Sequence, residues 1–373
     1  MAIIAIFCDG TWNSPRNPRQ THVERLCRVC ENSEDQNVFY FSGVGTGVGT
    51  MGFFEGLLDR FGGGLFGWGL NRNIKSAYLE LCRTYQPADK IMLFGFSRGA
   101  YTARSLAGMI RKCGILEEPT PEKVNEAFRL YRMRGEENEP DAEHIIAMRR
   151  KLSPRFATSY TDVMARGDDS ALVRITYLAV WDTVGALGVP GSILGPVARW
   201  WNQQYMFHDT RLSHLVEHAR HAVALDEKRV FFEPALWRNL SDTGEGPGLN
   251  RGDISEHRRY QQIWFAGVHS TIGGSTKDQS LASASLAWVF AGANELGLKL
   301  GQGFIVPEVP VDPTRDAPEI GAYSIFYRVL PWLLQWRMGP GEKRNLHPTV
   351  DERLDARPDY RPASLDKLNA LHT

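Results

Sequence analysis

One short segment has the residue pattern of a nucleophilic serine. It reads Gly95-Phe96-Ser97-Arg98-Gly99, a Gly-x-Ser-x-Gly sequence that follows the apolar run Ile91–Phe94 and precedes a helical pattern. In this context the serine lies on a tight turn between a strand and a helix, and the flanking glycines let the backbone close without clashes. The helix N-terminus stabilises negative charge at the turn. We therefore predict that Ser97 is a nucleophile and that Gly95 and Gly99 form its turn.

A serine hydroxyl needs a base to remove its proton, and the base needs a carboxylate to orient it. Asp182 ends the apolar run that begins at Ile175, and a turn follows it. His269 comes after the apolar run Ile263–Ala266 and opens a glycine-containing loop. Hydrolases with this serine turn carry the three residues in the order Ser, Asp or Glu, His. We predict Asp182 as the acid and His269 as the base.

Other candidates for these two roles have less suitable contexts. The chain has ten histidines, and among them His269 alone follows a predicted strand and enters a glycine-rich loop. Three histidines are predicted to lie on one helix, where packing is the ordinary role: His214, His218 and His221. Two carboxylates on predicted helical segments are the alternative acids: Asp209 and Asp226.

An oxyanion hole requires backbone donors close to the nucleophile. One donor is expected to be the amide of Arg98, directly after the serine. The loop Cys8-Asp9-Gly10-Thr11 follows the first apolar run, so the amide of Gly10 or Thr11 is the predicted second donor. Asp9 is expected to hold this loop through hydrogen bonds from its side chain to the backbone.

Three motifs fit other chemistries less well. Asp9-Gly10-Thr11 matches the end of the phosphatase motif Asp-x-Asp-Gly-Thr, but Phe7 stands where the nucleophilic aspartate is required. Gly43–Gly49 departs from the dinucleotide spacing Gly-x-Gly-x-x-Gly, and we interpret it as a flexible active-site loop. Cys27-x-x-Cys30 has no second ligand pair at metal spacing, so neither a metal nor a cofactor is predicted.

Short apolar runs that alternate with helical patterns predict a mostly parallel central sheet flanked by helices, which is an α/β-hydrolase-like α/β fold. The carboxyl ends of the strands then meet at one edge, where the polar residues above would gather. The predicted strands are Ile3–Phe7, Val38–Phe41, Ile91–Phe94, Ile175–Val180 and Ile263–Ala266. The predicted helices are Asn73–Tyr85, Arg98–Cys113, Pro121–Met133, Ser213–Leu225 and Ser280–Leu296.

The composition of the 373 residues, with 43% hydrophobic and 23% charged, is typical of a globular protein with a sizeable core. We predict a single domain over residues 1–373, with lid or cap insertions around 43–70, 115–170 and 185–210. Aromatic residues gather in the first and last of these and in Ala322–Met338. Such stretches are typical either of ordinary packing under loops or of a surface that accepts acyl chains.

Charge and hydropathy exclude several classes of protein. Lys+Arg and Asp+Glu balance at 43 each, and no basic stripe occurs, so nucleic acid is not a predicted partner. The start Met1–Phe7 has no basic region and is too short for a signal peptide. No apolar run reaches the ~18 residues that span a membrane. We expect a protein that is cytoplasmic on synthesis and whose secretion, if it occurs, uses a route without a signal peptide.

Five motifs occur in an order that is typical of one protein family: Phe7–Asn13, Gly95–Arg104, Val180–Gly185, His221–Glu227 and Trp264–Ser270. With them the chain resembles the bacterial α/β-hydrolase family that includes the phospholipase effectors of type VI secretion systems. The resemblance covers most of the chain. It departs from the family at Thr271, where the family often has an acid after the His-Ser pair. The long membrane-anchoring extension of larger members also has no counterpart in this sequence.

The resemblance implies a Ser97–Asp182–His269 triad and a phospholipid or related ester as substrate. The function it implies is that of a serine-dependent phospholipase or lipase acting through an acyl-enzyme. A soluble carboxylesterase and a non-catalytic interaction module are the alternatives. Some members of the family are antibacterial toxins, which implies a membrane surface, a secretion apparatus and an immunity protein as partners.

Overall fold

The computed structural model describes most of the chain. The described residues are 1–10, 19–43, 64–167, 171–185, 211–241, 247–315, 327, 330–366 and 368. Within these ranges no helix combines the length and the apolar character needed to cross a membrane. Most of the predicted insertions around 43–70 and 185–210, most of the Gly43–Gly49 loop, and the residues Thr11 and Asp209 lie outside the described residues, whereas residues 64–70 are described and helical.

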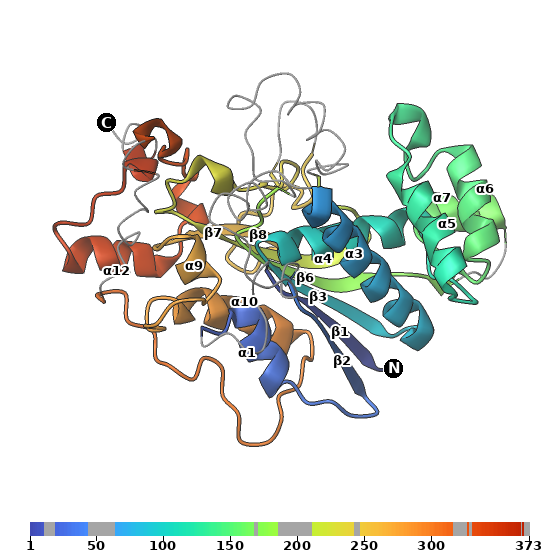
Figure 1. The fold of residues 1–373 in the computed structure, drawn as a ribbon, viewed down its shortest axis with the longest axis horizontal. Helices are drawn as coiled ribbons and strands as arrows, with labels where there is room; N and C mark the ends of the chain where they lie inside the picture. The colour runs from blue at the N-terminus through green and yellow to red at the C-terminus, as the bar shows by residue number, and fades with distance from the viewer. Residues whose placement is uncertain are drawn as a thin grey trace.

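A parallel sheet forms the centre of the described structure (Figure 1). Its six strands lie in the order β2-β1-β3-β6-β7-β8, and every neighbouring pair is parallel. The strands are β1 (Ile3–Cys8), β2 (Gln36–Phe41), β3 (Lys90–Phe96), β6 (Ile175–Trp181), β7 (Val216–Ala224) and β8 (Tyr260–Phe265). This sheet confirms the predicted α/β fold class.

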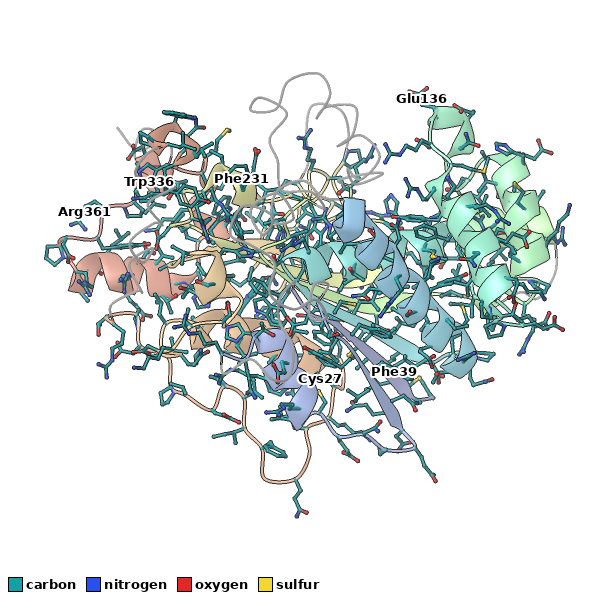
Figure 2. The ribbon with its side chains drawn as sticks, in the orientation of Figure 1. Cys27, Phe39, Glu136, Phe231, Trp336 and Arg361 are labelled. Carbon is teal, nitrogen blue, oxygen red and sulfur yellow. The ribbon has the colours of Figure 1, made fainter. Side chains whose placement is uncertain are left out.

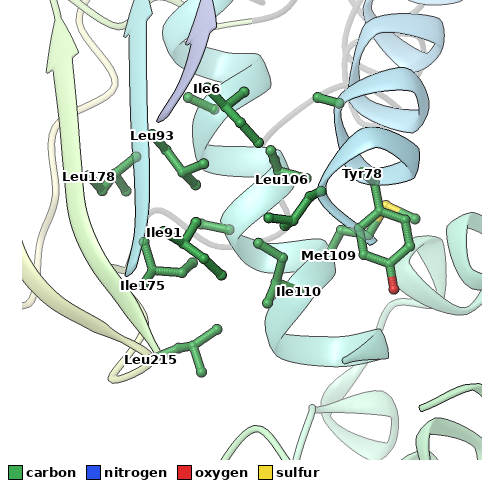
Figure 3. Packing of buried hydrophobic residues seen from close by; sticks show 14 of the residues in the cluster. Ile6, Tyr78, Ile91, Leu93, Leu106, Met109, Ile110, Ile175, Leu178 and Leu215 are labelled. Atoms are coloured by element: carbon green, nitrogen blue, oxygen red, sulfur yellow. The ribbon is translucent and has the colours of Figure 1, made fainter. Parts of the chain in front are cut away.

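Both faces of the sheet are apolar, because helices cover each of them. In β1, Ile4 and Ile6 face one side, whereas Ile3 and Phe7 face the other. Figure 3 shows the first side, where Ile6, Ile91, Leu93, Ile175 and Leu178 of the strands pack against Leu106, Met109 and Ile110 of a helix. The strands therefore read as continuous apolar runs in the sequence rather than as alternating ones.

In the described part of the chain, helices cover both faces. On the side of Figure 3 these are α3 (Gly64–Thr84) and α4 (Arg98–Cys113), and Tyr78 of α3 donates a buried hydrogen bond to the carbonyl oxygen of Gly114. On the other side are α1 (His22–Val29) and α10 (Ser283–Glu295). The predicted helix Arg98–Cys113 is confirmed at both ends, and Asn73–Tyr85 proves to be the second half of a longer helix.

Residues 115–167 form a helical group beyond the C-terminal end of α4, at the right of Figure 1. Its elements are α5 (Pro121–Arg132), η1 (Glu136–Asn138), α6 (Glu143–Leu152), β4 (Phe156–Ala157) and α7 (Tyr160–Arg166), and β4 pairs with β5 (Ala171–Leu172). Two buried arginines, Arg149 and Arg166, bind the two oxygens of Asp162 at 2.7 and 2.8 Å. This ion cluster joins α6 to α7.

The predicted helix Ser213–Leu225 is wrong, because the segment forms the strand β7. Its alanine, leucine, glutamate and arginine residues favour a helix locally, but β7 lies between β6 and β8 and satisfies its backbone by pairing with both. His218 and His221 are therefore strand residues, and Asp226 follows the carboxyl end of the strand. Tertiary pairing overrides a weak local preference here.

The C-terminal part of the chain packs beside the carboxyl ends of β7 and β8. Its elements are α9 (His269–Ile272), η3 (Pro331–Leu333), η4 (Lys343–Asn345), α12 (Pro348–Ala356) and η5 (Ala363–Leu365), and η2 (Val230–Phe232) follows β7. Val350 and Leu365 join Val223 and Trp264 in a third apolar cluster. The C-terminal segment is thereby held against the edge of the sheet where the predicted site residues lie.

Candidate active site

Ser97 lies on a sharp turn between β3 and α4. Its backbone has φ 56° and ψ −121°, a conformation that non-glycine residues rarely adopt. Holding such a residue costs about 1–3 kcal/mol, and strain of this kind is concentrated at functional sites. The Ser97 amide donates to the carbonyl oxygen of Trp181 on β6 at 3.0 Å, which holds the turn to the neighbouring strand.

The two glycines of the turn are required by close backbone contacts. A Cβ atom on Gly95 would lie 2.5 Å from the carbonyl oxygen of Gly99. A Cβ atom on Gly99 would lie 2.5 Å from the carbonyl oxygen of Asp9 and would also overlap the backbone of Cys8. The start of α4 therefore rests directly on the loop after β1, and both predicted turn glycines have a steric reason.

Ser97, His269 and Asp182 are joined by two hydrogen bonds. His269 Nε2 lies 2.9 Å from Ser97 Oγ, and His269 Nδ1 lies 2.5 Å from Asp182 Oδ2. The three residues come from the carboxyl ends of β3, β6 and β8, and each is nearly or fully buried. The structure thus brings together the three residues that the sequence selected, in the geometry a serine nucleophile, a base and an orienting acid require.

Asp182 is a buried carboxylate with several donors. Besides His269, it accepts hydrogen bonds from the Ala224 amide at 2.9 Å and from both terminal nitrogens of Arg337 at 2.7 and 2.9 Å. Burial alone would raise the pKa of Asp182, but the charge of Arg337 and the hydrogen bond with His269 outweigh it and hold the pKa well below its usual range. Asp182 is therefore ionised at neutral pH.

The His269 ring is buried against two aromatic side chains. It contacts the rings of Phe96 and Phe232, with centroid distances of 4.8 and 4.7 Å. Its backbone amide donates to the buried Glu227 at 3.2 Å, and Glu227 is itself bound by Arg229 through two nitrogens. Burial lowers the pKa of His269, although the hydrogen bond and charge of Asp182 oppose the shift. A neutral imidazole can accept a proton from Ser97.

The loop after β1 lies beside the turn of Ser97. The carboxylate of Asp9 accepts hydrogen bonds from the Gly10 amide at 2.6 Å and from the hydroxyl groups of Thr21 and Tyr40 at 2.7 Å each. Asp9 thus holds the loop as expected. Because the Gly10 amide is bonded to Asp9 and Thr11 lies outside the described residues, the assignment of Gly10, Thr11 and Arg98 to an oxyanion hole stays a prediction.

The competing residues have structural partners elsewhere. His221 is buried on β7, where its Nε2 accepts from the Thr183 amide at 3.2 Å and its Nδ1 lies 3.1 Å from Gln262 Oε1. Asp226 accepts from the Gly267 amide and from the hydroxyl of Tyr360. The described hydrogen bonds of these two residues do not include Ser97. His221 supports the residue after Asp182, and Asp226 holds the loop that leads to His269.

Sequence reasoning missed two charged residues around the site. Arg337 reaches Asp182 from a distant part of the chain, and no local motif marks it. Glu227 holds the His269 backbone, and its only signal was its place at the end of the segment His221–Glu227. Both residues act through contacts between segments far apart in sequence, which spacing alone cannot reveal.

A parallel sheet with a hydrogen-bonded Ser–His–Asp arrangement at its carboxyl edge places this protein in the α/β-hydrolase class of folds. A family model described as the catalytic domain of the Tle1-like phospholipase effectors of type VI secretion systems matches residues 3–292. The chain belongs to this family, as its motifs predicted.

Three known proteins are similar to parts of this chain. An uncharacterized protein of Saccharomyces cerevisiae, YEL023C, is 30% identical over 243 residues, which are 61% of this chain and 32% of the relative. A crystal structure of an uncharacterized Pseudomonas aeruginosa protein is 17% identical with a TM-score of 0.43, and covers 83% of this chain and 47% of that one. The Tle1 effector bound to the VgrG spike is 18% identical with a TM-score of 0.33, over 74% and 51%. The chain thus spans a third to a half of the length of these proteins.

Proposed function

We propose that this protein is a serine hydrolase that cleaves acyl esters of phospholipids through an acyl-enzyme. Ser97 is the nucleophile, His269 the general base and Asp182 the residue that orients it. The observation that carries the proposal is the continuous hydrogen-bond path from Ser97 Oγ through the imidazole to the Asp182 carboxylate. Membership of a family of phospholipase effectors supports the choice of substrate class.

The chemistry follows from the positions of the protons. His269 Nε2 takes the proton of Ser97 Oγ while the oxygen bonds to the carbonyl carbon of the ester. The bond to the leaving alcohol then breaks, and His269 returns the proton to that alcohol. Water repeats the sequence on the acyl-enzyme and releases a fatty acid. The backbone amide of Arg98, directly after the nucleophile, would stabilise the negative oxygen by about 3–4 kcal/mol.

An exposed apolar segment beside the site supports a lipid rather than a small soluble ester. Trp332, Trp336 and Met338 have exposed fractions of 62%, 38% and 72%, and Arg337 between the last two binds Asp182. Lys228 lies 3.9 Å above the ring of Trp336. Tryptophan next to a cation is suited to the headgroup region of a bilayer. Figure 2 shows Trp336 and Phe231 in the upper left part of the view and Glu136 at the upper right.

The experiment is hydrolysis of phosphatidylethanolamine and phosphatidylglycerol vesicles by the wild type and by Ser97→Ala, with products read by mass spectrometry. Fatty acid and lysolipid from the wild type alone are the expected result. Cleavage of p-nitrophenyl butyrate without any lipid product would instead indicate a soluble carboxylesterase. A wild type that neither hydrolyses an ester nor reacts at Ser97 with a fluorophosphonate would indicate a non-catalytic interaction module.

The role in the cell is a separate proposal that rests on the family. We propose that the protein is an antibacterial effector that a type VI secretion apparatus delivers by a route without a signal peptide, and that an immunity protein restrains it. Directing the chain to the periplasm of a bacterial host tests the toxic role. We expect the wild type to arrest growth and Ser97→Ala to be tolerated. Equal growth with both chains would contradict it.

A further inference from the structure

Arg337 makes a set of contacts that converge on Asp182. Its Nη1 donates to Asp182 Oδ1 at 2.7 Å and to the carbonyl oxygen of Ala224 at 2.8 Å. Its Nη2 donates to Asp182 Oδ2 at 2.9 Å and to the carbonyl oxygen of Phe232. The side chain is 6% exposed, so these bonds lie in a medium that screens charge weakly. One planar guanidinium thus contacts both oxygens of the acid and the two backbone segments on either side of it.

The segment that carries Arg337 is held to the loop after β7. Leu334 and Arg229 form an isolated β-bridge, and the Gln335 amide donates to the carbonyl oxygen of Lys228 at 2.7 Å. Leu333 is buried. These contacts place the backbone of residue 337 independently of the ion pair, so the guanidinium is presented to Asp182 by a structure that is already formed.

We propose that Arg337 is a positioning residue for the acid of the triad, and that the working site therefore includes a C-terminal segment beyond the residues that the family model matches. The matched range ends at residue 292, and Arg337 lies 45 positions further along. This inference rests on the proposed function of the triad. Arg337 holds both Asp182 oxygens, so that Oδ2 faces His269 Nδ1 and the imidazole keeps Nε2 towards Ser97.

The charge of Arg337 has a second consequence. His269 and Asp182 take up a proton as a pair, and a cation next to the pair makes that uptake less favourable. Among the described residues, the other charged or titratable groups near the pair include Glu227 and Arg229 at the His269 backbone and His221 behind Thr183. Removing the cation is expected to move proton uptake by the pair to higher pH. A lysine in its place would keep the charge and lose only the two-oxygen geometry, so it is not expected to move proton uptake.

The test compares Arg337→Gln, which removes the charge, with Arg337→Lys, which keeps the charge but cannot bind both oxygens. Arg258→Gln is the matched control, because Arg258 is also buried and also donates to carbonyl oxygens. It precedes the amino end of β8, whereas the site lies at the carboxyl ends of the strands. One readout is the rate at which a fluorophosphonate labels Ser97 as a function of pH. The other is the pH titration of the downfield proton of the imidazole N–H shared with Asp182, which needs no substrate.

We expect both Arg337 variants to label Ser97 about tenfold to a hundredfold more slowly, because small displacements of the base are costly. The pH at which labelling slows in acid should move to a higher value in Arg337→Gln alone. Arg258→Gln should change neither. The proposal would be overturned if a folded Arg337→Gln labelled Ser97 at the wild-type rate with the wild-type pH dependence. A wild-type labelling rate in Arg337→Lys would also overturn it. A wild type that fails to label while its imidazole proton still shifts in Arg337→Gln would refute the proposed function and leave the positioning role supported.

Discussion

The backbone amide of Ser97 donates a hydrogen bond of 3.0 Å to the carbonyl oxygen of Trp181, the residue before Asp182. The turn that carries the serine and the strand end that carries the acid are therefore joined by the hydrogen-bond ladder of the sheet. Both residues also have positive φ, 56° for Ser97 and 39° for Asp182. The sheet holds two strained residues side by side, and His269, which follows β8, forms a hydrogen bond with each of them.

The first prediction concerns the pH dependence of activity. His269 must be neutral to accept the proton of Ser97, and burial lowers its pKa from the usual 6.5. Activity is thus present above the lowered pKa and lost as pH falls through it. We expect the rate of hydrolysis of a soluble ester to fall in acid with a midpoint below pH 6.5. Initial rates between pH 4.5 and 8.5 measure the limb, and a midpoint above pH 7 would contradict the assignment.

The second prediction concerns the close contact at Gly99. In Gly99→Ala the added Cβ would overlap the backbone of Cys8 and Asp9, so α4 or the β1 loop must move. We expect a loss of about 1–3 kcal/mol in the free energy of unfolding, as overpacking usually causes, together with slow labelling of Ser97. Urea unfolding and labelling rates measure the two effects.

Gly108→Ala is the control for this variant. Gly108 lies on the same helix, and its added Cβ would meet only the ring edge of Tyr131 at 3.2 Å. Alanine is also the better helix former by roughly 0.5–1 kcal/mol. We expect a small change in stability of either sign and normal labelling. Equal effects of the two substitutions would show that the contact at the turn has no special role.

The third prediction concerns the exposed tryptophans near the site. Replacing Trp332 and Trp336 together by Gln removes apolar surface that would enter a bilayer, worth ~1.5–3 kcal/mol for each side chain fully buried. We expect vesicle hydrolysis to fall about tenfold or more while hydrolysis of a soluble ester is unchanged. Phe304→Gln is the control, because Phe304 is 51% exposed on a loop after α10. A loss on both substrates would point to a structural role for the pair.

The fourth prediction concerns stability in acid. Burial lowers the pKa of His22 and of His221 to about 3 and that of His347 to about 4. In the unfolded chain these rings titrate near 6.5. The unfolded state therefore binds more protons as pH falls below that value, so stability is full above about pH 6.5 and decreases towards pH 4. Each ring contributes roughly 1.4 kcal/mol per pH unit between about pH 6 and pH 4.

Urea midpoints at pH 7.5, 6.5 and 5.5 measure this slope. His221→Gln can keep the hydrogen bonds with Thr183 and Gln262 but cannot titrate, so its slope should be smaller by about one proton. His144→Gln, which alters an exposed histidine, is the control. An unchanged slope in His221→Gln would mean that His221 takes up protons equally in the folded and unfolded states.

The sequence by itself determined the class of fold, because parallel strands covered on both faces must be continuous apolar runs, and such runs are visible as β1, β3 and β6. It also determined the turn of Ser97, since strand, Gly-x-Ser-x-Gly and helix are contiguous. The acid and the base could be selected because strand ends in a parallel sheet converge, and the structure places Asp182 and His269 within hydrogen-bond distance of one another.

Only the tertiary structure decided the rest. The segment around His221 resembles a helix locally and becomes β7, because pairing with two neighbours contributes more than its weak helical preference. Arg337 could not be found from spacing, since it reaches Asp182 across 155 positions and its role depends on the segments between them. Local motifs report the geometry of a turn, whereas the charge around a buried carboxylate depends on which distant segments pack against it.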